Sequence, residues 1–229
     1  MNDWRIQHGK VIADFMTYLS EQSLNFVLKG GTALYLCYKL DRFSEDIDLD
    51  GRAKELVGLV SDFCERNGYS FRVAKDTDTV QRCFINYGNE GRPLKIEASY
   101  RLREIHEEDI DRINGILVYK IEPLCVMKAG AYSQRDRIRD LNDLTFIWKN
   151  YREQLSRQTI ALLRTNFTHK GIDQFDYLIH NQQDELIDKK KLADEFLELL
   201  DGLGLLYSEE ERNLLEEVEN DDEYEPDYD

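Results

Sequence analysis

The chain has 229 residues, which is enough for one generous domain or two small ones. Hydrophobic residues make up 41% of it, so a substantial core is expected, and no uninterrupted apolar run is long enough to cross a membrane. The formal net charge of −16 disfavours general nucleic-acid binding, but twelve acidic residues and a single basic one fall between Glu209 and Asp229. The rest of the chain is therefore only mildly acidic and can carry a local basic surface.

The cysteine and histidine residues argue against several enzyme classes. The four cysteines, Cys37, Cys64, Cys83 and Cys125, are widely spaced and show no metal-ligand or redox motif. The four histidines are scattered as well, which argues against a zinc enzyme and against Cys-His or Ser-His catalysis. Because the first residues contain no secretory signal, we expect a cytoplasmic protein with reduced, buried thiols.

The first part of the chain alternates helical and strand-like segments. Apolar residues at helical spacing between Val11 and Leu19 predict a helix over about residues 4–21. Residues 25–29 form a short apolar run that ends at two glycines, which indicates a buried strand. A short helix is expected over 32–40, so the order strand, glycine pair, helix opens the fold.

Alternating acidic and aliphatic residues follow, from Asp46 to Asp50. This period of two predicts a strand with Ile47 and Leu49 facing the core, and with Asp50 facing solvent at the strand end. The remaining patterns predict a helix over about 52–67, strands over 69–74, 80–87, 93–101 and 116–119, and helices from Glu122 onward.

These segments predict a mixed α/β (α+β) fold in two parts. Residues 1–120 are expected to form the α/β domain and residues 121–219 a helical domain. Residues 220–229 are acidic and poor in aliphatic side chains, which is typical of a disordered tail.

Two motifs of the α/β part suit phosphate and metal chemistry. Gly30 and Gly31 let the backbone approach a ligand closely, and the amides at the start of a helix bind phosphate oxygens. Asp46 and Asp48 are two apart on a predicted strand, so their carboxylates project from one face. Such a pair repels itself unless a cation neutralises it, and Mg²⁺ prefers oxygen ligands. A pair of Mg²⁺ ions can clamp both the attacking and the leaving oxygen of a displacement.

A third acid follows on a later predicted strand. Alternation in residues 94–101 places Lys95, Glu97, Ser99 and Arg101 on one face. Glu97 is then able to supply a third oxygen ligand or to accept the proton of an attacking hydroxyl. Each of these motifs taken alone also suits an ordinary surface, so their combination carries the interpretation.

In combination they resemble the DNA polymerase β-like nucleotidyltransferase superfamily, whose signature is a glycine pair, a short helix and Asp-x-Asp on the next strand. Residues 28–34 (Leu-Lys-Gly-Gly-Thr-Ala-Leu) and 42–50 (Arg-Phe-Ser-Glu-Asp-Ile-Asp-Leu-Asp) look more specifically like the AbiEii/AbiGii toxin family of bacterial abortive-infection and type IV toxin–antitoxin systems. A later helical motif with Lys128 and Asp140 also matches. The resemblance covers about residues 26–145 and implies a polymerase β-like mixed sheet with flanking helices.

The resemblance implies a role for each matching residue of the first two motifs. Gly30, Gly31 and Thr32 are similar to the loop that holds the phosphates of the nucleotide. Asp46 and Asp48 are similar to the ligands of the catalytic metal. These five residues are therefore the expected centre of the site.

The later motifs complete this implied site. Glu97 matches the third catalytic acid and metal ligand, at a position where many relatives have aspartate. Lys128 matches a lysine that contacts the triphosphate, and Asp140 matches an acid that orients Lys128, Arg139 or the nucleotide. All three are expected to take part in catalysis.

The implied activity is transfer of a nucleotide from an NTP to an acceptor hydroxyl with release of pyrophosphate, with one or two Mg²⁺ ions as cofactor. The tRNA 3′ end, or another RNA, is the acceptor that the resemblance implies, and a cognate antitoxin is a further partner that need not bind stably. The alternatives are transfer to a protein or small-molecule hydroxyl, and nucleotide binding without transfer. A basic cluster either contacts RNA phosphates or is a solvated helix face: Arg135, Arg137, Arg139, Lys149 and Arg152. No membrane partner is expected.

Overall fold

The computed structural model describes residues 4–88, 92–102 and 104–206. The chain forms two compact units, one that ends at Gly130 and one that begins at Ala131. The division falls within helix α4 (Ile121–Gln134). It lies ten residues after the boundary predicted at residue 120, which coincides with the start of this helix. The predicted acidic tail, residues 220–229, lies outside the described residues.

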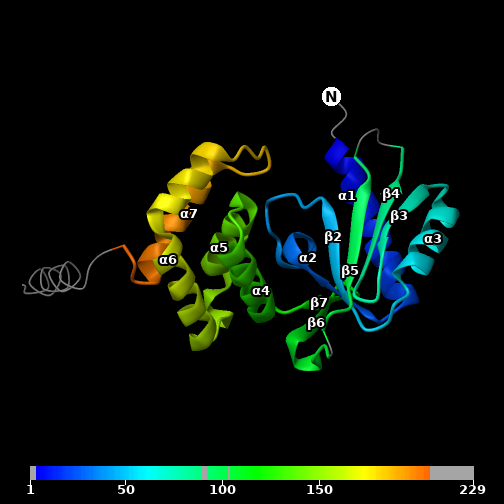
Figure 1. Ribbon diagram of the computed structural model, residues 1–229, viewed down its shortest axis with the longest axis horizontal. Helices are drawn as coiled ribbons and strands as arrows, with labels where there is room; N and C mark the ends of the chain where they lie inside the picture. Colours follow the sequence, from blue (N-terminus) through cyan, green and yellow to red (C-terminus); the bar gives the residue numbers. More distant parts are fainter. Residues whose placement is uncertain (1–3, 89–91, 103, 207–229) are drawn as a thin grey trace, which may run out of the picture. The chain divides into compact units, whose positions relative to one another are not determined.

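A seven-stranded mixed sheet forms the centre of the first unit (Figure 1). Its strands are β1 (Phe26–Lys29), β2 (Asp46–Gly51), β3 (Ser70–Asp76), β4 (Val80–Asn86), β5 (Leu94–Ser99), β6 (Ile110–Ile113) and β7 (Ile116–Tyr119). They follow the order β3-β4-β5-β2-β1-β7-β6 across the sheet. The pairs β2–β5 and β1–β7 are parallel and the other pairs are antiparallel. The acidic strand β2 is therefore an inner strand, flanked by β1 and β5.

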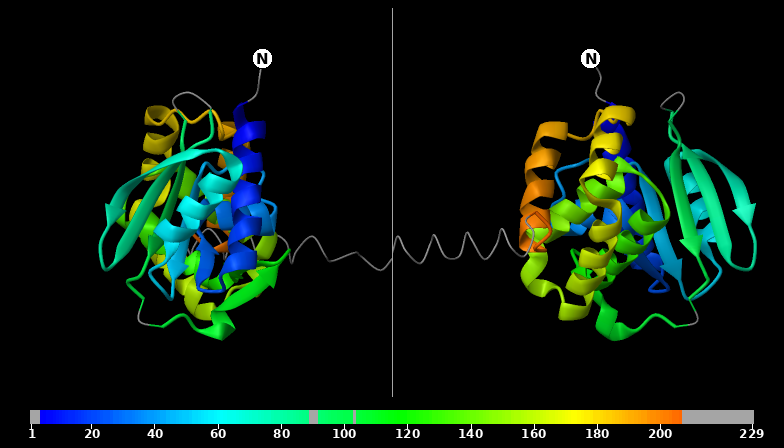
Figure 2. Two further views of the ribbon diagram at one scale, coloured as in Figure 1. Left: turned by 90° about the vertical axis from the view of Figure 1, so that its right-hand side faces the viewer. Right: turned by 60° about the vertical axis from the view of Figure 1, so that its left-hand side comes forward.

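Three α-helices among the described residues lie wholly in the first unit: α1 (Trp4–Gln22), α2 (Gly30–Tyr38) and α3 (Leu56–Asn67). Helices α1 and α3 lie side by side on the same side of the sheet (Figure 2, left), and the rings of Phe15 and Phe63 meet edge to face at 5.2 Å. Ile47, Leu49 and Ile96 of the sheet are fully buried and alternate with half-buried polar residues. One face of the β4–β5–β2 region is thus core, and the other carries the polar side chains.

The mixed α/β fold is confirmed, and the differences from the predicted elements are local. Helix α2 begins at Gly30, so the glycine pair forms its first turn instead of preceding it. Strand β6 was not predicted, because its four residues Ile-Asp-Arg-Ile are too short to show a clear period. It forms an antiparallel hairpin with β7 through Asn114-Gly115, and both turn residues have positive φ (51° and 85°), as a tight two-residue turn requires.

The second unit is helical, as predicted, and contains the end of α4 with α5 (Ile138–Tyr151), α6 (Arg157–Asn181) and α7 (Lys189–Gly202). Leu141, Leu144 and Ile147 form an apolar stripe along α5, and all three are fully buried. Ser156 caps α6 by accepting a hydrogen bond from the amide of Thr159, and Asp188 caps α7. Among the helices that the structure describes, none is both long and apolar enough to cross a membrane.

Candidate active site

The acidic pair lies at the start of β2, where the strand alternates between core and open face. Ile47 and Leu49 are fully buried and fix the strand, and Asp46 and Asp48 project from the opposite face. The side chains of Asp46 and Asp48 remain 46% and 41% exposed. Two carboxylates therefore share one solvent-accessible face on a strand that cannot slip without unburying its aliphatic residues.

Gly30 approaches this pair from the first turn of α2. Its φ is +74°, a left-handed conformation that residues with a Cβ atom rarely adopt. A Cβ atom built at this position would lie 3.1 Å from Oδ2 of Asp48. The glycine thus allows both the turn from β1 into α2 and the close approach of helix backbone to a carboxylate.

Thr32 and Ser44 support the same corner from inside the unit. The side chains of both residues are buried, and their hydroxyl oxygens lie 2.8 Å apart. The Thr32 hydroxyl also donates a hydrogen bond to the main-chain carbonyl of Asp46. The Thr32 side chain therefore positions the start of β2. Its backbone amide belongs to the first turn of α2, where helices bind phosphate.

A lysine from β5 neutralises the acidic pair. Nζ of Lys95 lies 3.0 Å from Oδ2 of Asp46 and 3.9 Å from Oδ1 of Asp48. Burial alone lowers the pKa of Lys95, but Asp48 and the hydrogen bond to Asp46 outweigh this effect, so its pKa is raised. Desolvation raises the pKa of Asp48, and repulsion from Asp46 and Glu97 adds to this effect, while Lys95 opposes it.

These observations test whether the acidic pair suits a metal ion. Asp46 and Asp48 already hold one cation, the Lys95 ammonium, between oxygen atoms that remain accessible to solvent. Carboxylate oxygens beside the start of a helix form the type of donor set that Mg²⁺ and a phosphate use together. Asp46 and Asp48 therefore fit a divalent cation in chemistry and in exposure.

Glu97 lies on the same face but faces a different cation. It pairs directly with Asp48 in the parallel register of β2 and β5, and its carboxylate forms an ion pair with Arg82 of β4. Among the residues that the structure describes, no group of three or more histidine, cysteine or acidic side chains is placed to hold a metal. Glu97 thus adjoins the pair without completing a three-ligand set.

The prediction that Asp50 faces solvent was wrong. Its side chain is buried, and its carboxylate accepts hydrogen bonds from Nζ of Lys29 at 2.5 Å and from the hydroxyl of Tyr119 at 3.0 Å. Tyr119 comes from β7, which joins the sheet on the far side of β1. Asp50 is therefore a structural residue that ties three strands together, although it shares a face with Asp46 and Asp48.

Comparisons with known proteins identify the family of the chain. Residues 14–228 match the model of the nucleotidyl transferase AbiEii toxin family of type IV toxin–antitoxin systems. The chain belongs to this family. It is a nucleotidyltransferase, and the match covers both the acidic pair and the later helical motif.

Two solved structures from Helicobacter pylori are similar along most of their length. JHP933 is 30% identical, with a TM-score of 0.75, over 96% of this chain and 99% of that one. A candidate nucleotidyltransferase is 29% identical, with a TM-score of 0.73, over 89% of this chain and 96% of that one. A search of the curated proteins found no match. The family fold is thus present with both units.

The later family motif falls on both sides of the division between the units. Lys128 lies on α4 in the first unit and is half-buried. Asp140 lies on α5 in the second unit and is buried, and Arg135 donates two hydrogen bonds to its carboxylate, at 2.7 and 3.0 Å. Arg135 was not among the partners expected for Asp140. Arg139, which was, forms an ion pair with Asp184.

The basic cluster of the second unit is largely neutralised by neighbouring acids. Besides Arg135 and Arg139, Lys149 lies within 3.5 Å of Glu195 and Glu198. Arg152 pairs with its neighbour Glu153 at 3.3 Å. The net positive potential of this cluster is therefore much lower than its sequence indicates.

Lys95 and Arg82 are the site residues whose roles the sequence did not reveal. Lys95 had one signal, the alternation of β5, which placed it on the face of Glu97, and Arg82 of β4 had none. Their partners are 49 and 15 residues away along the chain, so the contacts depend on strand pairing. Both residues hold cationic groups beside acids of the candidate site, so both belong to it.

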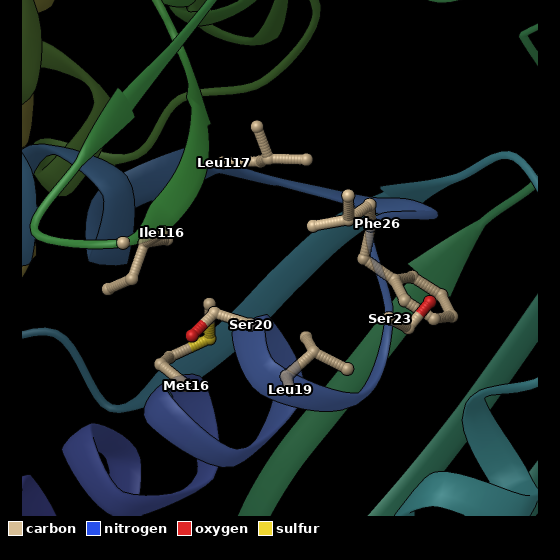
Figure 3. A pocket seen from close by; sticks show the side chains of 9 residues that line it. Met16, Leu19, Ser20, Ser23, Phe26, Ile116 and Leu117 are labelled. Atoms are coloured by element: carbon tan, nitrogen blue, oxygen red, sulfur yellow. The ribbon is translucent and has the colours of Figure 1, made fainter.

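A small cavity elsewhere in the first unit is too small for a nucleotide (Figure 3). It lies between α1, β1 and β7, has a volume of about 10 Å³, and is lined by residues that include Met16, Phe26 and Leu117. A volume of this size holds about one water molecule. The cavity is a packing feature and takes no part in the site.

Proposed function

We propose that this protein is a Mg²⁺-dependent toxin that transfers a nucleotide from an NTP to an RNA acceptor such as the 3′ end of a tRNA. The observation that carries the proposal is the pair Asp46 and Asp48 beside the first turn of α2, with a cation already between the two carboxylates. Nucleotidyl transfer requires positioning and charge neutralisation more than covalent chemistry. A strand that fixes two carboxylates next to a phosphate-binding helix start supplies both.

In this proposal the residues of the first unit divide into two groups. Asp46 and Asp48 hold the metal, and the amides of Gly30, Gly31 and Thr32 hold phosphate oxygens. Bound Mg²⁺ supplies positive charge to the phosphates and to the departing pyrophosphate. Because Gly30 lies against Asp48, the two groups are held in a fixed relationship.

Three further residues have roles that follow the family pattern. Glu97 is the third acid, and it becomes available to the metal or the acceptor hydroxyl when Arg82 releases it. Lys128 contacts the triphosphate and stabilises the negative charge that develops during transfer. Asp140 acts through Arg135, which it orients with two hydrogen bonds.

The family supports the biological part of the proposal. Members are described as toxins of type IV toxin–antitoxin systems. An RNA acceptor, a cytoplasmic site of action, a role in abortive infection and a cognate antitoxin without a stable complex follow from that description as predictions. A toxin that modifies the tRNA 3′ end stops translation, so this function predicts growth arrest when the protein is expressed.

A labelling experiment tests the proposal. Purified protein is incubated with Mg²⁺, total tRNA and each α-labelled NTP in turn, and the products are separated into RNA, protein and small molecules. We expect label in RNA with wild-type protein, and a loss of at least about a hundredfold with Asp48→Asn or Asp46→Asn. Asp14→Asn is the matched control, because it makes the same charge change at an exposed position on α1.

The outcomes separate the alternatives. Label in protein or small molecules alone would show that the acceptor is wrong and the chemistry right. Nucleotide binding without pyrophosphate release would contradict the chemistry. Full labelling by Asp48→Asn would contradict the assignment of the site.

A further inference from the structure

Two rows of side chains run from the acidic pair to the edge of the sheet. Residues directly opposite one another on neighbouring strands share a face, so the register of β2, β5, β4 and β3 defines each row. The first row is Asp46, Lys95, Phe84 and Arg72, and the second is Asp48, Glu97, Arg82 and Lys75. Both rows begin at a catalytic carboxylate and end at a basic residue on edge strand β3.

A β-bulge produces this arrangement. Arg72 and Lys75 are three residues apart, and in a regular strand an odd spacing places side chains on opposite faces. The register shifts between Val73 and Lys75, so Ala74 is an additional residue of β3. Arg72 is consequently opposite Phe84 and Lys75 is opposite Arg82. The bulge therefore turns Lys75 to the face that carries the acidic pair.

The outer part of this face is positively charged and accessible. Arg72 and Lys75 are exposed, and the side chain of Arg82 is 38% exposed. Six of the eight residues in the two rows lie on β3, β4 and β5. Glu97 is the one acid among these six, and it forms an ion pair with Arg82. Two exposed basic residues thus lie on the same face of the sheet as the acidic pair, in a chain whose net charge is −16, and this arrangement favours a polyanion.

An aromatic ring lies within the same face. The guanidinium of Arg72 lies 4.1 Å from the centre of the Phe84 ring, which holds the arginine side chain flat over the sheet. Arginine planes and aromatic rings are the surfaces on which bases of single-stranded RNA stack, and basic residues beside them contact the phosphates. The face therefore combines both elements of single-strand recognition.

We propose that the face formed by Arg72, Lys75, Arg82 and Phe84, here called the β3–β4 face, binds the single-stranded 3′ segment of the RNA acceptor. The inference rests on the proposed function, because it assumes that the acceptor is RNA. Strand β3 is three strand spacings from β2, about 14 Å, which equals the rise of about four stacked nucleotides. Arg72 and Lys75 then contact the RNA a few nucleotides before the reacting hydroxyl.

A structural alternative exists for the same residues. Exposed lysine and arginine on an edge strand also prevent edge-to-edge pairing between protein molecules. That role predicts no effect on RNA binding. The bulge favours RNA binding over edge protection, because it places both basic side chains on the face that carries the acidic pair. Protection of an edge does not require both side chains on that face.

Fluorescence anisotropy with a labelled eight-nucleotide RNA, at several salt concentrations, tests the β3–β4 face. We expect Arg72→Gln/Lys75→Gln to bind at least about tenfold more weakly than wild type. The slope of log affinity against log salt should fall by about 1.4, because two phosphate contacts are lost. The matched control is Lys10→Gln/Arg66→Gln, which removes two exposed basic residues from α1 and α3, including an arginine over the Tyr18 ring.

A second measurement uses the length of the acceptor. With the eight-nucleotide acceptor, the double variant should have a raised KM and a kcat near the wild-type value. With a dinucleotide acceptor, both KM and kcat should stay near their wild-type values. If wild-type protein labels RNA but the double variant binds and reacts like the control, the β3–β4 face is not the RNA site and the proposed function stands. If wild-type protein labels no RNA, the proposed function fails and this inference fails with it.

Discussion

Nζ of Lys95 lies 3.0 Å from Oδ2 of Asp46, so the protein's own ammonium group occupies part of the position proposed for the metal ion. The same ammonium lies 3.9 Å from Asp48, and both acids remain accessible. The Lys95 ammonium offsets part of the repulsion between the two adjacent carboxylates and opposes the rise in the pKa of Asp48. It also repels a divalent cation that approaches the same oxygens.

Replacing this lysine should therefore increase metal affinity. We expect Lys95→Met to bind Mn²⁺ about tenfold more tightly than wild type, which corresponds to about 1.4 kcal/mol. Partial solvent exposure keeps the gain well below the full Coulomb energy at this distance. Isothermal titration of Mn²⁺ measures the effect directly, and Lys10→Met on the exposed side of α1 is the control. Weaker binding by Lys95→Met would show that the lysine supports the metal site.

The left-handed conformation of Gly30 gives a second prediction. We expect Gly30→Ala to lower stability by about 1 kcal/mol and activity by about a hundredfold, because the new Cβ atom meets Oδ2 of Asp48 at 3.1 Å. Gly68→Ala is the matched control. Gly68 has a similar φ of +66°, but its Cβ atom would meet nothing within 4 Å. Backbone strain is common to both variants, so both should show a lower unfolding temperature. Displacement of the Asp48 carboxylate is specific to Gly30→Ala, so only this variant should lose nucleotidyl transfer.

The contrast between Gly30 and Lys95 shows how much of the site could be predicted from sequence. The glycine pair and the alternation of β2 are local, so Gly30, Asp46 and Asp48 were recognisable within about 20 residues. The contact of Lys95 with Asp46 depends on parallel pairing between strands 49 residues apart. Sequence periodicity indicates which face a side chain occupies, but it does not indicate which strand becomes its neighbour.

Two other features were unpredictable for related reasons. Asp50 continues the alternation of Asp46 and Asp48, and its burial depends on Tyr119, 69 residues later. The bulge at Ala74 places Lys75 beside Arg82, and no turn residue or glycine marks it in the sequence. Asp50 keeps the period of two and is buried by its tertiary contacts, whereas the bulge interrupts the period within β3.

The raised pKa of Asp48 predicts how stability depends on pH. Desolvation, with repulsion from Asp46 and Glu97, disfavours the ionised form in the folded state. A carboxyl group with a raised folded-state pKa adds stability at pH values below its unfolded pKa of about 3.9 and loses that contribution as pH rises through the folded pKa. Without metal, Asp48→Asn should therefore be more stable than wild type at pH 7.

Urea unfolding in EDTA at several pH values measures this difference. The advantage of Asp48→Asn should shrink as pH falls and disappear near pH 3, where Asp48 is protonated in both states. Asp14→Asn, exposed on α1, should show no such pattern. An advantage that is equal at all pH values would show that ionisation of Asp48 is not its cause.

The pair Arg135 and Asp140 gives the last prediction, which concerns the second unit. Asp140 is 2% exposed and receives two hydrogen bonds from Arg135, so Arg135→Gln removes two charge-assisted hydrogen bonds from a buried carboxylate. We expect a loss of about 2–3 kcal/mol in the free energy of unfolding, less than for a fully buried pair because Arg135 is 48% exposed. Arg152→Gln, at an exposed pair with Glu153, should cost less than about 0.5 kcal/mol.

A double-mutant cycle distinguishes a structural role of Asp140 from a catalytic one. If Asp140 acts by holding Arg135, then Arg135→Gln, Asp140→Asn and the double variant should lose similar amounts of activity when assayed well below their unfolding temperatures. The sum of the stability losses of the two single variants should also exceed the loss of the double variant, because each single variant removes the same interaction. If Asp140 contacts the nucleotide, Asp140→Asn should lose far more activity than Arg135→Gln at equal stability, and the proposed route through Arg135 would be wrong.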